Sequence, residues 1–139
     1  MQIQEGPGWR FCVDPARDPY PVLIGGDGWA VEFDAGEART FVDGCCLLAD
    51  ELEAMADQLM PEERVTLELE RDTLWLELEG QPSSWRLRFV LTPGPAARGV
   101  EAGWSDTATA ALVAALRQAR EATPLPPSEF SRPSPRPAP

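Results

Sequence analysis

The apolar residues of this sequence change their spacing at Pro61, and this change sets which elements the chain can form. Before Pro61 an apolar residue recurs every three or four positions, which predicts one amphipathic helix of about six turns. Asp34 and Glu37 stand three residues apart at its start, as in a capping box, and Pro61 marks its end. The apolar stripe consists of Ala38, Phe41, Cys45, Leu48, Leu52, Met55 and Leu59.

After Pro61 apolar and polar residues alternate, which is the pattern of strands with one buried face. The alternation runs through residues 65–70, 74–79 and 85–91, with short connections between them. We therefore predict an antiparallel meander with a leucine-rich face toward the core and a charged face toward water. Glutamates on the first two strands and arginines on the third predict cross-strand ion pairs. The charged residues are Glu68, Glu70, Glu77, Glu79, Arg86 and Arg88.

The remaining segments repeat this organisation. Strands are predicted at residues 9–13, 20–24 and 29–33, with a glycine-rich hairpin turn at 25–28. A short strand at 99–104 and a helix capped by Ser105 follow the second meander. The order strands, helix, strands, helix indicates an α+β fold made of duplicated antiparallel meander-plus-helix units.

Domain organisation follows from the size of the two units. We assign a single domain to residues 1–122, with halves at about 5–60 and 61–122, because each half alone has too little core. Seven of the seventeen residues at 123–139 are proline. This composition predicts a disordered tail.

Composition excludes several kinds of chemistry. The 139 residues include no histidine and no lysine, which removes imidazole bases, histidine metal ligands, Schiff bases and a P-loop lysine. We therefore expect no catalytic residue, no metal site and no cofactor, and a protein that is not an enzyme. A carboxylate-based enzyme ranks third among the functions considered, since a chain with 23 acidic residues always offers carboxylate pairs.

The three cysteines form neither a CxxC motif nor a disulfide framework, which fits a reducing cytoplasm. Cys45 lies on the apolar stripe, and Cys46 is expected toward the outer face of the helix. The nearby carboxylates of Asp43 and Asp50 would raise a thiol pKa, so we interpret both cysteines as packing residues. Neither a basic-apolar leader nor a run of eighteen apolar residues is present, so we expect a cytoplasmic chain outside the membrane.

The net charge of −11 is concentrated in residues 34–63, where nine acidic residues accompany one arginine. Asp43, Asp50 and Asp57 repeat every seven residues on the side of the predicted helix opposite the apolar stripe. These three residues, the acidic strip, form either a solvated outer face or a docking site for a basic partner.

Trp75 lies on the charged face of the second meander, near Glu77, Arg86 and Arg88. Tryptophan and arginine dominate binding hot spots, so these four residues are a candidate surface for an unknown protein partner. Alternatively, Trp75 lies under a loop or the tail. Four glutamates and two arginines on this face would repel a phosphate backbone, so nucleic acid is not the expected partner. The chain itself is expected to be a monomer or a homodimer.

Five segments in order resemble a small cyanobacterial family known as a domain of unknown function. They are EGPGWRFCVDP, YPVLIGGDGWAVEF, QLMPEERVTLELE, LWLELEG and SWRLRFVL, and the similarity covers about residues 5–120. Members of that family look like the Whirly-type fold, in which two meander-plus-helix units form a module similar to transcriptional regulators that bind single-stranded DNA. The resemblance implies this fold and assigns no catalytic residue.

The sequence thus favours a non-enzymatic protein-interaction module in regulation or assembly. The alternative is a single-stranded nucleic-acid-binding transcriptional regulator, as the resemblance implies.

Overall fold

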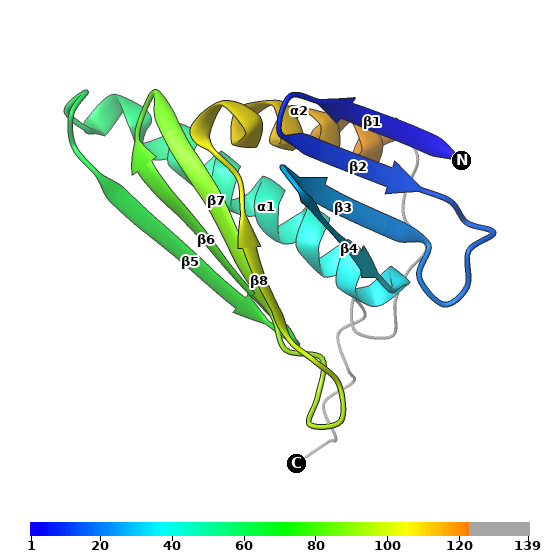
Figure 1. Cartoon of the computed structure of the whole chain (residues 1–139). Helices are drawn as coiled ribbons and strands as arrows, with labels where there is room; N and C mark the ends of the chain where they lie inside the picture. The colour runs from blue at the N-terminus through cyan, green and yellow to red at the C-terminus, as the bar shows by residue number, and fades with distance from the viewer. Residues whose placement is uncertain (123–139) are drawn as a thin grey trace, which may run out of the picture.

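A computed structural model of the chain describes residues 1–122. These residues form two four-stranded antiparallel sheets and two long helices, in the order four strands, helix, four strands, helix (Figure 1). The predicted α+β fold of two meander-plus-helix units is confirmed. The prediction of a disordered tail at 123–139 concerns residues outside the described part. Neither of the two long helices is long and apolar enough to cross a membrane.

The first sheet has the strand order β1-β2-β3-β4, and its strands are β1 (Gln2–Gly6), β2 (Trp9–Val13), β3 (Val22–Gly26) and β4 (Trp29–Phe33). Sequence reasoning missed β1, because Ile3 is its one aliphatic residue and is 53% exposed, so no apolar alternation marks the strand. The strand expected at 20–24 begins two residues later, at Val22. Pro21 has no N–H to donate to a sheet, and Tyr20 is exposed.

The hairpin turn expected at 25–28 is confirmed, but it is tighter than expected. Gly25 and Gly26 belong to β3, so Asp27 and Gly28 make the turn. Gly28 has a φ of +75°, which favours glycine. The indole of Trp29 covers Gly26, where an added β-carbon would lie 2.5 Å from the indole nitrogen.

The second sheet follows the predicted meander closely. Its order is β5-β6-β7-β8, and the strands are β5 (Val65–Arg71), β6 (Leu74–Gln81), β7 (Ser84–Leu91) and β8 (Val100–Gly103). Leu76 and Leu78 of β6 are at most 2% exposed on the inner face, while the glutamates between the leucines face outward. The alternation therefore predicted both the strands and their buried face.

Helix α1 (Ala35–Met55) starts with the predicted capping box. The Glu37 backbone N–H donates to the Asp34 carboxylate at 2.8 Å, and the Asp34 N–H donates to Glu37 Oε1 at 2.9 Å. The helix ends earlier than the apolar stripe suggested, and a 3-10 turn, η1 (Ala56–Gln58), follows it. Helix α2 (Asp106–Ala122) is capped by Ser105, whose hydroxyl accepts the Ala108 N–H at 3.2 Å.

Helix α1 packs chiefly on the sheet of the other unit, and α2 contacts both sheets. Helix α1 packs chiefly on β5 and β6, whereas α2 packs on β1, β2 and β7. One continuous core results, and its centre is an aromatic cluster from both halves formed by Trp29, Phe33, Phe41, Phe89 and Trp104. Trp104 also joins the halves directly, since its indole N–H donates to the Gly25 carbonyl at 2.9 Å.

The packing of α2 on α1 corrects one expectation. Cys46 was expected toward the outer face, but its side chain is 1% exposed, as is that of Cys45. A single-helix pattern takes the side opposite the apolar stripe to be solvent. Here α2 contacts α1, so α1 is buried over more of its circumference than its stripe indicates.

Candidate functional site

The outer face of the second sheet carries Trp75 near the turn between β5 and β6. In the strand register Trp75 lies between Glu70 of β5 and Val90 of β7, and Val90 in turn is paired with Glu101 of β8. The indole is half-buried, and the guanidinium carbon of Arg88 lies 5.0 Å from the centroid of its ring. This cation–π contact covers part of the ring. Trp75, Val90 and Arg88 form what we call the Trp75 centre.

Ion pairs lie along one side of the Trp75 centre. Arg88 reaches Glu77 at 3.2 Å and Glu101 at 3.0 Å, so one guanidinium joins three neighbouring strands. Arg86 pairs with Glu79 at 2.9 Å. Both Glu77–Arg88 and Glu79–Arg86 are directly opposed in the register, as the sequence predicted. The face therefore carries an ordered lattice of opposite charges beside the apolar side chains of Trp75 and Val90.

Glu79 lies between two cations, because Arg64 also donates a hydrogen bond to its carboxylate. The hydrogen bonds from Arg86 and Arg64 lower the pKa of Glu79. The same pairing raises the pKa of Arg86. Both side chains thus stay charged over a wider pH range than they would alone, and the lattice persists through neutral pH.

An open groove of about 580 Å³ runs beside these ion pairs, where β8 ends and leaves the first half of β7 without a partner strand on its β8 side. The chain after β8 turns inward there, and the Trp104 N–H donates to the Leu87 carbonyl at 3.0 Å. The groove is lined by Glu77, Glu79, Arg86, Leu87, Arg88, Gly103, Trp104 and Ser105. Three of the four predicted surface residues therefore share one groove, with Trp75 beside it.

The acidic strip is divided between different surroundings. Asp43 pairs with Arg39 at 3.1 Å and with Arg120 of α2 at 3.2 Å. Asp50 pairs with Arg117 of α2 at 2.7 Å. Asp57 is exposed in η1, after the end of the helix. Two of the three aspartates therefore bind arginines of this same chain, across the contact between α1 and α2.

The thiols are poorly suited to nucleophilic chemistry. Burial raises the pKa of Cys45 well above its ordinary value. Burial also raises the pKa of Cys46, despite a hydrogen bond from Arg120, and that of Cys12 on the first sheet. The thiolate is the reactive form, and these shifts favour the protonated thiol at all three cysteines. Within residues 1–122, no group of three His, Cys, Asp or Glu side chains is placed to hold a metal ion.

Comparison with known proteins identifies the family. The model of the family described as "Domain of unknown function (DUF1818)" matches residues 4–119. The chain belongs to the DUF1818 family. A search of the curated proteins finds no match for this DUF1818 chain.

Among the solved structures that match the DUF1818 chain is one that resembles it in both sequence and fold. It is a protein of unknown function from Prochlorococcus sp. NATL2A, described as a member of the DUF155 family. The two are 39% identical with a TM-score of 0.80, and the match covers 85% of this chain and 98% of the other. The cyanobacterial domain of unknown function inferred from the sequence is thereby supported at the level of an uncharacterised family.

Some members of the candidate site in this DUF1818 chain were not found from the sequence. Val90 and Glu101 join the Trp75 centre and its ion pairs only through the pairing of β7 with β6 and β8. Arg64 precedes β5 in the chain and reaches Glu79 on β6. The alternation in residues 85–91 places Val90 on the outer face with Arg86 and Arg88, but only the strand register sets it beside Trp75. No local sequence signal marks Glu101 or Arg64.

Proposed function

We propose that this DUF1818 chain is a cytoplasmic, non-enzymatic protein-interaction module used in regulation or assembly. Its partner binds the outer face of the second sheet. The observation that carries the proposal is the Trp75 centre, in which Trp75 and Val90 lie beside Arg88 and its ion pairs with Glu77 and Glu101. Binding hot spots combine a large apolar anchor with surrounding polar contacts that exclude water.

The ion pairs also favour binding because they hold the Arg88 side chain in one conformation. Arg88 is held by Glu77, Glu101 and the face of Trp75 at the same time. A side chain already fixed in the free protein loses less conformational entropy when a partner docks. This arrangement supports a surface prepared for a partner more than a set of mobile solvated charges.

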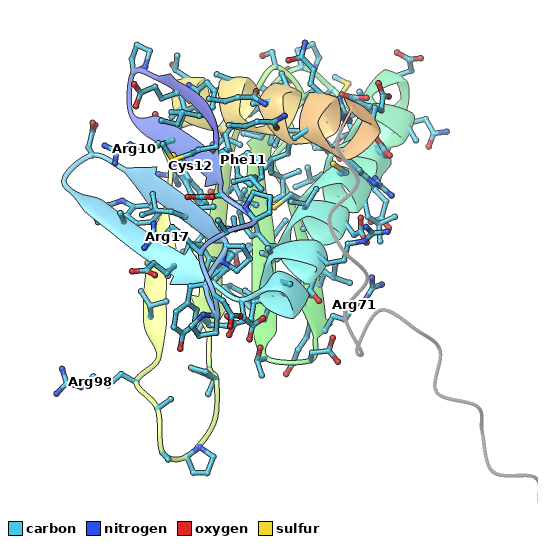
Figure 2. All side chains as sticks on the ribbon, turned by 90° about the vertical axis from the view of Figure 1, so that its right-hand side faces the viewer. Arg10, Phe11, Cys12, Arg17, Arg71 and Arg98 are labelled. Carbon is cyan, nitrogen blue, oxygen red and sulfur yellow. The ribbon has the colours of Figure 1, made fainter. Side chains whose placement is uncertain are left out.

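We further propose that the likeness to the Whirly-type fold is one of architecture and does not extend to nucleic-acid binding. Arg10 and Arg17 lie on the side of the first sheet, and Arg98 extends from the β7–β8 connection (Figure 2). Arg10 pairs with Glu5 at 3.4 Å, and Arg17 pairs with Glu32 at 3.1 Å. Pairing with glutamate offsets the positive potential that a phosphate backbone requires.

A pull-down from the native cytoplasm followed by mass spectrometry identifies the partner, and its affinity for Trp75→Ala then tests the surface. We expect a loss of about 2 kcal/mol, roughly thirtyfold in Kd, with the cooperative unfolding transition retained. Tyr20→Ala is the control, because it also truncates an aromatic side chain at the surface, here one that is 46% exposed and lies in the first half of the chain. Unchanged affinity of Trp75→Ala would refute the assigned surface.

A second measurement distinguishes a protein partner from a nucleic-acid partner. Fluorescently labelled single-stranded DNA and RNA are titrated with the full chain at several salt concentrations. We expect no binding near physiological salt. Sub-micromolar binding that weakens steeply as salt rises would overturn the protein-partner proposal in favour of a nucleic-acid-binding regulator.

A further inference from the structure

Among residues 1–122, no strand pairs with the outer edge of β5, the edge strand beside the Trp75 centre. Strand β5 is the terminal strand of its sheet, on the side away from the first sheet (Figure 1). With seven residues it is the longest of the four terminal strands, since β1 and β4 have five residues each and β8 has four. Its outer backbone edge is a template for an added strand.

The inner side chains of β5 are incompletely covered. Leu67 and Leu69 are half-buried, although their register partners Leu78 and Leu76 on β6 are at most 2% exposed. The difference arises because β6 has a strand on each side and β5 has one on a single side. Apolar side chains from an added strand would cover the open flank of Leu67 and Leu69.

The outer side chains of β5 are acidic and lack ion pairs. Glu68 and Glu70 are exposed, and neither forms a salt bridge with any residue in the range 1–122. Glu68 is moreover directly opposite Glu77 in the register, so two carboxylates face each other across β5 and β6. Basic side chains at alternate positions of an added strand would compensate both carboxylates.

We infer that β5 binds an extended segment of the partner protein in which apolar residues alternate with arginine or lysine. The segment adds to the sheet as a fifth strand, with its apolar side chains beside Leu67 and Leu69 and its basic side chains beside Glu68 and Glu70. This inference rests on the proposed function, because Glu70 is directly opposite Trp75 and the two surfaces are continuous. It names the chemistry of the partner and the mode of binding.

A second copy of β5 is a poor occupant of the same edge. Antiparallel self-pairing that keeps the leucines on one face places Glu68 opposite Glu68, Glu68 opposite Glu70, or a glutamate opposite Thr66. Like charges directly opposed across strands are unfavourable, and none of these registers places the arginine of β5, Arg71, opposite a glutamate of β5. Charge complementarity therefore favours a basic strand from another protein.

The test uses the full chain and a labelled seven-residue peptide that alternates arginine and valine, matched to the length of β5. Fluorescence anisotropy measures its Kd. A peptide of the same composition, with the arginines grouped at one end, controls for charge alone. A third peptide, N-methylated at every residue, keeps the side chains but cannot donate backbone hydrogen bonds. We expect the grouped and N-methylated peptides to bind at least about tenfold more weakly than the alternating one.

Variants of the protein place the site. Glu68→Gln with Glu70→Gln should weaken the alternating peptide about fivefold, as expected for the loss of two cross-strand charge pairs. Asp27→Asn with Glu121→Gln is the matched control. It changes the net charge equally at exposed positions away from β5 and should leave Kd unchanged.

Each outcome decides the inference separately from the proposed function. No binding, equal binding of all three peptides, or equal loss in both double variants would overturn strand addition at β5. If the natural partner loses affinity for Trp75→Ala but not for Glu68→Gln with Glu70→Gln, the proposed surface stands and the inference fails. If the natural partner and the peptide respond to the β5 variant while Trp75→Ala has no effect, the inference stands and the Trp75 centre is not the anchor.

Discussion

Replacing Gly44 by alanine tests how closely α1 approaches the second sheet. Gly44 is a buried residue of α1, and a β-carbon there would collide with the Leu76 side chain and lie 3.0 Å from Leu69 Cδ2. Leu76 is 1% exposed within the core, so it has little room to rotate away. The absence of a side chain at Gly44 therefore permits the helix to pack directly on β5 and β6.

Two opposing effects determine the result. Alanine in a helix interior is about 1 kcal/mol more favourable than glycine, so local propensity predicts stabilisation. Overpacking a dense core costs about 1–3 kcal/mol. Because the clash involves a fully buried side chain, we expect the packing cost to exceed the propensity gain. The net loss for Gly44→Ala should be about 1 kcal/mol, or a decrease in Tm of about 4 °C.

Urea denaturation followed by circular dichroism measures the free energy of unfolding of each variant. Ala114→Gly is the control for propensity, because Ala114 is exposed within α2, and this change should cost about 1 kcal/mol. Leu76→Val makes space at the contact, so its combination with Gly44→Ala should cost less than the sum of the single changes. If Gly44→Ala instead stabilises the protein by as much as Ala114→Gly destabilises it, α1 does not pack on the sheet at Gly44.

Three further predictions concern the core, the thiols and the contact between the helices. Leu48→Asp should abolish the unfolding transition seen by circular dichroism, because it places an unpaired charge at a position that is 1% exposed. Asp50→Asn should lower the free energy of unfolding by less than about 1 kcal/mol. Equally mild effects of the two changes would contradict the assigned face of α1. The pKa of buried Cys45 is raised well above the ordinary value of 9.0. Above pH 9.0 the Cys45 thiol of the unfolded chain therefore loses a proton that the folded protein keeps. The free energy of unfolding should fall as the pH rises through 9.0. This fall should be smaller in Cys45→Ala, as urea titrations at pH 7.5 and 9.5 would reveal, and an identical fall in both proteins would show that Cys45 is not its source. Arg117→Gln should lower Tm at low salt and have less effect in 1 M NaCl, because the ion pairs of Arg117 with Asp50 and Glu53 are exposed to solvent. A decrease in Tm that does not depend on salt would mean that Arg117 acts through packing of its alkyl chain.

Elements whose signals are local were predictable from the sequence. The capping box of α1 needs only Asp34 and Glu37, and a hairpin turn at Asp27–Gly28 needs only a residue that tolerates positive φ. The leucine alternation of β5, β6 and β7 reports a buried face within each strand. Such signals can be recognised in a single sequence because the residues that form them lie within a few positions of each other.

The candidate site was only partly predictable for the same reason. The alternation placed Trp75, Glu77, Arg86 and Arg88 on one face, and the short connection between β6 and β7 made their Glu–Arg pairing foreseeable. The position of Arg88 over the Trp75 ring depends on side-chain packing across two strands. The open edge of β5 depends on the order of all four strands in the sheet.

The sequence by itself determined which helices and strands form and which face of each is apolar. The signals for these features, the spacing of apolar residues and the capping residues, lie within one to three helical turns or a single hairpin. The tertiary structure alone decided which helix packs on which sheet. Because α2 returns to cover α1, Cys46 becomes buried. Asp43 pairs with Arg120, which is more than seventy positions away in the chain. Asp50 pairs with Arg117, which is 67 positions away. Contacts at such separations depend on how whole elements pack together, and no local pattern in the sequence records them.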